Sequence, residues 1–546
     1  MLARIIRNPS GYNPRLNYYK RGTPEVIDVQ TNYVLEQMEF YGFITHEECE
    51  AAKADSVNVL EKSTAAADAM YENAYYVEYA IYDVVTKMLR VENLEDTSSN
   101  RSAMETKLRN GGYRIYTCLD GDIQEAVQTV ITNWSDYPNM RHESDRSRES
   151  SIGGGETITV VQPQAAAAVM DWHTGELLAV VGGRSKPIQK KQLNRAYQMK
   201  MPVGSSIKPL SVYGPAFDMG FSPGTPVLNL PIPINGWVSE NGYPSNYGGG
   251  GYTGVESMRY AINKSHNTSC AQALYTYVGI ENSVTYLLKL GVKPSSINAT
   301  GAGLALGSSG ISPIEMAAAF GAIANLGQYQ EPYAFTQVLN PDGSIYIDVN
   351  QIQITRQAFK PSTAWLLVDV LKGCVGEEGT GQNANFGNIT VAGKTGTNSN
   401  NIGVFFAGMT AYYSAAVWVG SDDYNPLTTD ATGGTYAAPL WAAIMARVHV
   451  LTGNTKDKDI ITKSARSLGL VRAESCAVSG MKPTRACRAS GFGVNVDYYL
   501  SGTEPTAECN MHRANGKLYI PEGHPLRNAL EVDDLKEYFE NVLVDE

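Results

Sequence analysis

Residues 165–184 read AAAAVMDWHTGELLAVVGGR, two short apolar runs on either side of the turn D-W-H-T-G-E. Turn residues between two apolar runs are typical of a β-hairpin. Three more short apolar runs follow at hairpin spacing near the end of this region: VAGKTGT (391–397), VFFAGMTAYY (404–413) and AAVWVGS (415–421). Helical segments lie between the two groups of strands. The sequence therefore predicts an α+β fold in which helices cover an antiparallel sheet.

Composition and length divide the chain into four regions, with boundaries at residues 62/63, 157/158 and 448/449. The first region, 1–62, reads as helices. TNYVLEQMEFYGFI (31–44) has apolar residues at helical spacing, and THEE (45–48) forms a capping box that opens the next helix. The last region, 449–546, is polar and rich in turn residues, and it ends in the acidic run EVDDLKEYFENVLVDE.

The second region, 63–157, alternates between ordered and polar segments. NAYYVEYAIYDVVTKML (73–89) predicts a helix, and YRIYTCL (113–119) predicts a strand that a further helix follows. The polar stretch VENLEDTSSNRSAMETKLRNGG (91–112) is interpreted as a loop. The charged and glycine-rich RHESDRSRESSIGGGE (141–156) is interpreted as a flexible connection.

Bulk properties exclude several classes of protein. The chain has 546 residues, 43% of them hydrophobic and 18% charged, which is typical of a folded protein of several domains. Its formal net charge of −11 argues against nucleic-acid binding, which requires clustered lysine and arginine. The sequence contains no apolar run of about 18 residues, so it does not predict a membrane span. The basic N-terminus MLARIIRNPSGYNP has no long apolar core, so it does not read as a signal peptide.

Seven cysteines are present, and three of them lie near the end of the chain, at Cys476, Cys487 and Cys509. Since none forms a C-x-x-C pair, the spacing argues against a structural zinc site. The other four are interpreted as buried or idle thiols. The late three leave two interpretations open, free thiols or one disulfide if the protein is exported.

The stretch VGSSIKP (203–209) contains S-x-x-K, a possible nucleophile and base three residues apart. A helix that begins here places Ser205 and Lys208 on one face, and its free N–H groups can stabilise an oxyanion. Lysine acts as a base only where burial or positive charge lowers its pKa. A solvated serine and lysine on a surface helix is the alternative interpretation, and the same pattern recurs at Ser479–Lys482.

K-T-G occurs once in the chain, in VAGKTGT, where a strand at the edge of the sheet is expected. Gly396 has no side chain to obstruct an extended substrate that pairs with this edge. Lys394 and the hydroxyls of Thr395 and Thr397 suit a carboxylate. A glycine-interrupted strand end is the structural alternative.

A third motif, S-x-N, is weak as a pattern, and its matches begin at Ser98, Ser239, Ser265, Ser296 and Ser399. Position selects Ser265, with His266 and Asn267, because it lies between the two firmer motifs in what reads as one continuous helix. His266 is interpreted as a spacer. By the same reasoning we set aside the second S-x-x-K match, because it follows K-T-G and lies in the cysteine-bearing tail.

S-x-x-K, S-x-N and K-T-G in this order form the motif set of penicillin-binding proteins and class A β-lactamases. LNRAYQMKMPVGSSIKP, YTGVESMRYAINKSHN and LGSSGISPIEMAAAFGAIANLG also resemble the transpeptidase domain of bifunctional, class A penicillin-binding proteins over residues 158–448. Residues 63–157 look like the linker of that family. Residues 1–62 are similar to the C-terminal remnant of its glycosyltransferase domain. The resemblance implies a penicillin-binding, serine β-lactamase-like transpeptidase fold.

The resemblance also implies an activity, cross-linking of peptidoglycan stem peptides through a serine acyl-enzyme. Ser205 would attack the D-Ala–D-Ala carbonyl and Lys208 would take its proton. Ser265 would relay a proton to the leaving D-alanine and Asn267 would hold the substrate amide. Lys394 would raise the positive potential, while Thr395 and Thr397 would grip the carboxylate beside Gly396. The backbone N–H groups of Ser205 and Thr397 would form the oxyanion hole.

The implied partners are stem peptides, an acceptor amine, β-lactams as covalent inhibitors and a cell-wall synthesis complex at the outer face of the bacterial membrane. Neither a metal nor an organic cofactor is implied, and no nucleic acid. The sequence departs from the family in lacking the catalytic glutamates of the glycosyltransferase and the membrane anchor, so we expect an N-terminally truncated chain without glycan polymerisation. Val203 also separates Pro202 from Gly204. A D,D-carboxypeptidase, a β-lactamase-like hydrolase and a non-catalytic penicillin sensor are the alternatives.

Overall fold

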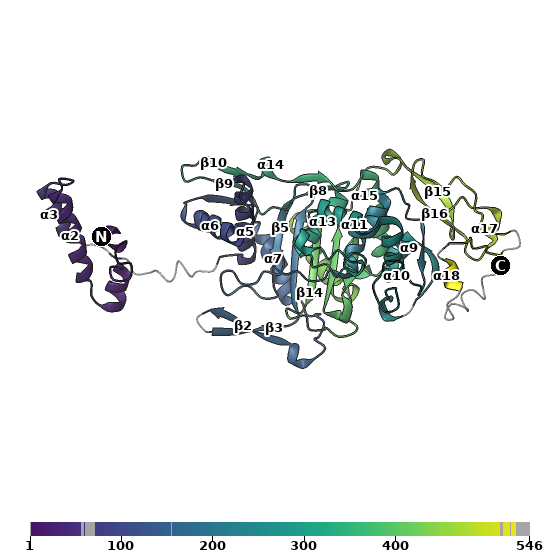
Figure 1. Cartoon of the computed structure of the whole chain (residues 1–546), viewed down its shortest axis with the longest axis horizontal. Helices are drawn as coiled ribbons and strands as arrows, with labels where there is room; N and C mark the ends of the chain where they lie inside the picture. Colours follow the sequence, from purple (N-terminus) through teal and green to yellow (C-terminus); the bar gives the residue numbers. More distant parts are fainter. Residues whose placement is uncertain are drawn as a thin grey trace. The chain divides into compact units, whose positions relative to one another are not determined.

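The computed structural model describes residues 2–55, 59, 71–153, 156–249, 251–513, 517–524 and 526–530 (Figure 1). The chain forms two compact units, Met1–Tyr71 and Glu72–Glu546. The expected domain boundary at residues 62/63 and the acidic run 531–546 lie outside the described residues. Among the helices that are described, none is both long and apolar enough to cross a membrane.

The first unit is helical, as predicted. Its elements are α1 (Leu2–Ile5), the π-helix η1 (Leu16–Arg21), α2 (Glu25–Phe40) and α3 (His46–Ala54). The capping box is confirmed, because Glu48 N donates to Thr45 Oγ1 at 3.2 Å while Thr45 N donates to Glu48 Oε2 at 2.8 Å. Two otherwise unpaired N–H groups at the start of α3 are satisfied in this way.

The centre of the second unit is a five-stranded sheet in the order β12-β13-β14-β4-β5. Its strands are β4 (Gln164–Asp171), β5 (Glu176–Val181), β12 (Ala392–Thr397), β13 (Gly403–Met409) and β14 (Ser414–Gly420), and every neighbouring pair is antiparallel. The predicted hairpins, β4–β5, β12–β13 and β13–β14, are therefore confirmed, and so is the α+β class. The K-T-G strand β12 lies at the edge of the sheet, as predicted.

Helices cover both faces of this sheet because successive residues of each strand point to opposite sides. Ala166, Ala168 and Met170 of β4 pack into one core with α13 (Pro313–Ala324) and α15 (Pro361–Cys374). The alternate residues Ala165, Ala167 and Val169 belong to a second core with α7 (Gly121–Asn133) and α16 (Ala438–Leu451). The run of alanines lets α13 approach the sheet closely.

Two loop predictions for the linker region are wrong. Residues 91–112 contain α6 (Ser98–Asn110), because Thr97 Oγ1 accepts from Asn100 N at 3.2 Å and Met104 and Leu108 are buried at helical spacing. Residues 147–153 form β2 (Ser147–Gly153), which pairs with β3 (Glu156–Val161). The predicted helix and strand are present as α5 (Ala74–Val91) and β1 (Arg114–Thr117), and β1 joins β9 (Phe335–Leu339) and β10 (Ile345–Asp348).

The helices between the two strand groups build the rest of the core. In chain order they are η3 (Gly204–Ile207), η4 (Pro209–Tyr213), α8 (Gly214–Asp218), α9 (Met258–Lys264), α10 (Asn267–Ala273), η6 (Leu274–Val278), α11 (Ile280–Lys289) and α12 (Gly301–Ala305). A short hairpin, β6 (Pro226–Asn229) with β7 (Gly254–Ser257), leads into α9. Smaller elements are η5 (Tyr247–Gly249), η7 (Pro294–Ser296), β8 (Gln328–Gln330), α14 (Val349–Ile352), β11 (Thr355–Gln357), η8 (Gln382–Ala384), η9 (Ser399–Asn401) and η10 (Gly433–Ala437).

The C-terminal segment forms η11 (Arg466–Leu468), β15 (Leu470–Cys476), α17 (Arg485–Ala489), β16 (Val494–Leu500) and α18 (Leu526–Leu530). β15 and β16 pair antiparallel, and Figure 1 shows this hairpin beside α9. Arg259 of α9 makes a bidentate ion pair with Asp497 of β16, Nε–Oδ2 2.7 Å and Nη2–Oδ1 2.6 Å. The extension is thus bonded to the helix that ends at Ser265.

Candidate active site

A cleft of about 1140 Å³ brings the three predicted motifs together. Its lining includes Ser205 from S-x-x-K, Ser265 and Asn267 from S-x-N, and Thr395 and Thr397 from K-T-G. The two lysines of the motifs, Lys208 and Lys394, are fully buried next to it. Position along the chain therefore selected the S-x-N match that lines this cleft.

Ser205 lies at the start of the helical segment that begins with Gly204. The predicted helix is present, but as a 3₁₀ turn, η3, followed by the π-helix η4 rather than as a regular α-helix. Gly204 has φ 58°, and a Cβ there would stand 2.7 Å from Thr397 N and 2.5 Å from Thr397 O. A glycine is thus required for the start of η3 to pack against the end of β12. This contact brings together the two segments that carry Ser205 and Thr397, whose backbone N–H groups are expected to form the oxyanion hole.

Ser265 does not lie within a continuous helix, contrary to the prediction. α9 ends at Lys264, Ser265 adopts a left-handed conformation with φ 63° and ψ 32°, and α10 starts at Asn267. A non-glycine residue in this region of backbone space costs about 1–3 kcal/mol, and such residues cluster at functional sites. The break turns the carbonyl groups at the end of α9 towards the interior, where Lys208 binds them.

Lys208 Nζ donates to three acceptors: Ser265 O at 2.7 Å, His266 O at 3.1 Å and Asn267 Oδ1 at 2.8 Å. Burial, with the neighbouring Lys394 cation as a further cause, lowers the pKa of Lys208 to about 7. A lysine normally titrates more than three pH units higher, so this side chain is neutral in a large fraction of molecules near pH 7. It therefore meets the requirement for a general base.

Lys394 Nζ donates to Ser265 Oγ at 2.8 Å and to the Thr395 carbonyl oxygen at 3.2 Å. Burial lowers the pKa of Lys394 to about 8. Since the Ser265 oxygen accepts a hydrogen bond from Lys394, the hydrogen of the Ser265 hydroxyl remains available to a group in the cleft. The arrangement can therefore pass a proton between Lys394 and a bound molecule.

The two threonines of K-T-G are held by neighbours. Thr395 Oγ1 lies 2.7 Å from Thr380 Oγ1, and Thr397 Oγ1 accepts from Gly433 N at 3.2 Å. Gly396 is also required by the protein's own packing. A Cβ at this position would stand 2.0 Å from the Val203 carbonyl oxygen, so the obstructed partner is the protein's own chain before Ser205.

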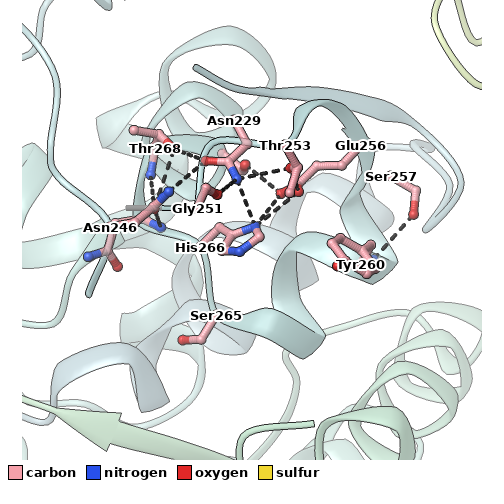
Figure 2. A network of polar contacts seen from close by, with 12 residues as sticks. Asn229, Asn246, Gly251, Thr253, Glu256, Ser257, Tyr260, Ser265, His266 and Thr268 are labelled. Carbon is pink, nitrogen blue, oxygen red and sulfur yellow. Dashed lines mark hydrogen bonds and ion pairs between the residues drawn. The ribbon is translucent and has the colours of Figure 1, made fainter. Parts of the chain in front are cut away.

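His266 is more than the spacer that the sequence suggested. Its Nδ1 donates to Glu256, whose oxygens lie at 2.9 and 3.0 Å, and the Glu256 side chain is only 4% exposed. Figure 2 shows His266 within this network while the neighbouring Ser265 hydroxyl points away from it. No local pattern predicted the network, because Glu256 lies on β7 and His266 follows α9.

Asn229 and Asn246 extend the network to the next helix. Asn229 Oδ1 accepts from Thr268 Oγ1 at 2.5 Å and from Asn246 Nδ2 at 2.7 Å. Asn246 Oδ1 accepts from Asn267 N at 2.7 Å, and Asn267 Nδ2 donates to Ser245 O at 2.9 Å. The start of α10, which carries Asn267, is fixed by these side chains.

The second S-x-x-K match does not line the cleft. Ser479 lies in the C-terminal segment, where its hydroxyl donates to Cys509 Sγ at 3.2 Å. All seven cysteines are free, so the three late ones are not joined by the disulfide that the sequence left open.

Comparison with protein families gives two matches. Residues 165–446 match the model of the penicillin binding protein transpeptidase domain. Residues 466–514 match that of the penicillin-binding protein 1A C-terminal domain. The first match covers more than half of the chain and includes all three motifs of the cleft.

Curated relatives carry the same family name. Penicillin-binding protein 1A of Clostridium botulinum strain Hall is 31% identical over 537 residues, which is 95% of this chain and 60% of that protein. Penicillin-binding protein 1A of Clostridium perfringens (strain ATCC 13124) is 33% identical over 419 residues, 74% of this chain and 48% of that protein. The chain thus spans about half to three fifths of the length of these relatives.

Solved structures share the fold. The crystal structure of penicillin-binding protein 1A from Haemophilus influenzae aligns with a TM-score of 0.57 and 20% identity, over 92% of this chain and 85% of that one. PonA1 of Mycobacterium tuberculosis, solved in complex with penicillin V, aligns with a TM-score of 0.54 and 21% identity, over 71% and 97% of the two chains. These alignments confirm the predicted fold.

Proposed function

Because the chain belongs to the penicillin-binding protein transpeptidase family, we propose that it cross-links peptidoglycan stem peptides as a serine-type D,D-transpeptidase that β-lactams inhibit. One observation carries the proposal. Two buried lysines converge on Ser265, Lys208 on its carbonyl oxygen and Lys394 on its hydroxyl, in the cleft that Ser205 lines. Their lowered pKa values suit one lysine to accept a proton and the other to supply one.

In the acylation step, Ser205 Oγ attacks the carbonyl carbon of the D-Ala–D-Ala bond and neutral Lys208 takes the hydroxyl proton. The C–O bond forms, and the C–N bond to the terminal D-alanine breaks. The leaving nitrogen receives the proton of the Ser265 hydroxyl, and Ser265 regains one from the Lys394 ammonium. The step ends with an ester at Ser205, a protonated Lys208 and a neutral Lys394.

Transfer reverses the proton flow. The amine of a second stem peptide attacks the ester carbonyl and loses a proton through Ser265 to Lys394. The new C–N bond forms the cross-link, the C–O bond breaks, and Lys208 returns its proton to Ser205 Oγ. Both lysines regain their starting states, so the cycle needs no further reactant.

The remaining site residues bind the donor peptide. The backbone N–H groups of Ser205 and Thr397 stabilise the oxyanion, and removal of one such donor typically costs about 100- to 1000-fold. Thr395 and Thr397 hold the terminal carboxylate, and Asn267 holds the peptide amide. A β-lactam acylates Ser205 in place of the peptide, because its strained amide presents a carbonyl and a carboxylate to the same groups. Because peptidoglycan stem peptides are cross-linked outside the cell, the proposed activity implies that the enzyme acts at the outer face of the bacterial membrane.

Covalent labelling tests the nucleophile. Wild-type protein incubated with a fluorescent penicillin should carry one adduct per chain, and peptide mapping should place it on Ser205. Ser205→Ala should remove the label, whereas Ser102→Ala, on the exposed face of α6, should leave it unchanged. An adduct on Ser479, or persistent labelling of Ser205→Ala, would overturn the assignment.

Product analysis separates the proposed transfer from its alternatives. Incubation with a stem pentapeptide substrate and an acceptor amine should yield a cross-linked dimer that is absent with Ser205→Ala. A trimmed tetrapeptide alone would indicate a carboxypeptidase. Stoichiometric acylation without turnover would indicate a penicillin sensor.

A further inference from the structure

Three cysteines and one histidine from separate parts of the C-terminal segment meet at one point. Cys476 ends β15, Cys487 lies in α17, and Cys509 and His512 follow β16. All four are buried, and their sulfur and nitrogen atoms lie within 4.8 Å of one another. The missing C-x-x-C pair, from which the sequence analysis argued against zinc, does not prevent the four side chains from converging. The local signal that this argument overlooked is C-x-x-H at Cys509–His512.

The three distances among Cys476, Cys509 and His512 match the edges of a tetrahedron around zinc, and Cys487 completes a group whose ligand atoms all lie within 4.8 Å of one another. With Zn–S bonds of about 2.3 Å and Zn–N bonds of about 2.05 Å, a tetrahedral site has S···S edges of about 3.8 Å and S···N edges of about 3.6 Å. Cys476 Sγ and Cys509 Sγ are 3.6 Å apart, and His512 Nδ1 lies 3.5 Å and 3.6 Å from them. A disulfide would instead hold the two sulfurs at about 2.05 Å.

The surroundings of the sulfurs resemble an outer shell for thiolates. Cys476 Sγ accepts from Ser479 N at 3.5 Å, and Cys487 Sγ accepts from Thr484 N at 3.3 Å. Cys509 Sγ accepts from the Ser479 hydroxyl at 3.2 Å. Such donors orient metal ligands and stabilise their negative charge.

His512 is 7% exposed, and its Nε2 has no hydrogen-bond partner in the part of the chain that the structure describes. Burial of an imidazole without partners costs free energy. The ring instead directs Nδ1 at two sulfurs, and a bound metal at Nδ1 would account for this orientation.

We propose that Cys476, Cys487, Cys509 and His512 bind one Zn²⁺ as a structural site of the C-terminal domain. Three thiolates and one imidazole fill all four tetrahedral positions, so no position stays open for substrate or water. Binding releases the three thiol protons, and the occupied site carries a net charge of −1.

The segment needs such a link because its own core is small. Cys476, Cys487 and Cys509 belong to a cluster of twelve buried residues that also contains Leu228, Leu230 and Ile232 of the transpeptidase domain. Small units with little regular structure commonly require a metal or disulfides for stability. Zinc would join β15, α17 and the segment after β16 and hold them against β6. Asn229 at the end of β6 bonds Thr268 and Asn246, so the site supports the strand that fixes α10.

Metal analysis of the full chain tests the proposal. The protein should be purified with zinc supplied and without chelator, then desalted and analysed by plasma mass spectrometry. We expect one zinc per chain. His512→Ala and Cys487→Ser should each weaken zinc affinity at least about tenfold, since even the loss of an outer-shell partner costs 10- to 100-fold. The matched controls His142→Ala and Cys118→Ser should retain the metal.

Cobalt substitution of wild-type protein gives a second readout that does not depend on whether the variants fold. The proposed ligands should produce the intense visible bands of tetrahedral Co²⁺ with thiolate charge transfer in the near ultraviolet. Zinc affinity unchanged in both ligand variants, measured by competition with a chromophoric chelator, would overturn the proposal. So would a weak octahedral cobalt spectrum, or a Cys476–Cys509 disulfide in folded, metal-free protein by non-reducing peptide mapping.

Discussion

Lys208 Nζ lies 2.7 Å from the carbonyl oxygen of Ser265, a residue whose φ is 63°. The left-handed backbone at Ser265 and the buried amine of Lys208 explain each other, because a chain that leaves the helix at Ser265 can offer this carbonyl to Lys208. Lys394 binds the hydroxyl of the same serine. One residue therefore separates the two lysines and contacts both, which fixes the geometry of the proposed proton transfers.

The pH dependence of acylation should be bell-shaped. Lys208 must be neutral to take the Ser205 proton, and its pKa of about 7 means that the neutral fraction rises as pH increases through that value. Lys394 must be protonated, and its pKa of about 8 means that this fraction falls at higher pH. The second-order rate constant for benzylpenicillin, measured from about pH 5 to about pH 10, should rise and then fall with apparent pKa values of the pair. A rate that keeps rising to about pH 10 would contradict this assignment.

The two roles of Ser265 can be separated by substitution. Ser265→Ala removes the hydroxyl and keeps a side chain in the left-handed region, whereas Ser265→Gly removes both. Both variants should lose about 100- to 10,000-fold in acyl transfer, the usual range for a proton-transfer group. The free energy of unfolding of Ser265→Gly should nevertheless exceed that of Ser265→Ala by about 1 kcal/mol, because glycine has no Cβ that strains the left-handed backbone. Thermal unfolding compares the two proteins, and equal stabilities would show that the backbone is not strained.

His266 should matter for positioning although it takes no part in the proposed proton transfers. His266→Ala leaves the buried Glu256 carboxylate without its imidazole partner, which should cost about 1–3 kcal/mol. The start of α10 would lose support, so acylation should slow while the adduct stays on Ser205. Penicillin labelling rates and thermal unfolding measure the two effects. His142→Ala, at an exposed histidine, is the matched control. An unchanged His266→Ala protein would restore the spacer interpretation.

The sequence predicted the parts of the site that local pattern determines. The hairpin at 165–184 and the strand of K-T-G follow from apolar runs and turn residues, and motif order selected Ser205 and Ser265. The break at Ser265 was missed because INKSHNTSC has no helix-terminating glycine or proline. The contact with Lys208, 57 residues earlier in the chain, offsets the local preference for helix.

Long-range assembly explains the other failures. Glu256 and His266 bond across a strand and a helix, and the four proposed zinc ligands span residues 476–512, so neither set forms a short motif. The polar composition of residues 91–112 led to the prediction of a loop. That prediction took no account of the Thr97 cap or of Met104 and Leu108, which are buried at helical spacing in α6. Composition indicates exposure, but caps and helical spacing determine whether a polar segment folds.

Gly396→Ala should disrupt the site although it changes none of the proposed catalytic side chains. The new Cβ would meet the Val203 carbonyl oxygen at 2.0 Å, so η3 and β12 must separate. Overpacking of this kind costs about 1–3 kcal/mol. The displacement of Ser205 should lower the acylation rate more than a stability loss alone explains. Gly491→Ala, where nothing lies within 4 Å of the added Cβ, is the control for both measurements. Normal acylation of Gly396→Ala would contradict the proposed contact.

The ion pair between Arg259 and Asp497 should couple the C-terminal extension to the active site. Asp497→Ala removes a nearly buried carboxylate that accepts two hydrogen bonds from Arg259. We expect a loss of about 1–3 kcal/mol, below the range of about 3–5 kcal/mol for a fully buried pair, because Arg259 is partly exposed and keeps its bond to Asp369. Faster proteolysis of the extension and slower acylation should accompany it, since α9 leads from Arg259 to Ser265. Glu474 lies on β15 of the same hairpin and makes an exposed ion pair with Arg488 of α17. Glu474→Gln breaks this pair and should change neither the proteolysis rate nor the acylation rate. If both variants behave alike, the extension does not support α9 through this ion pair.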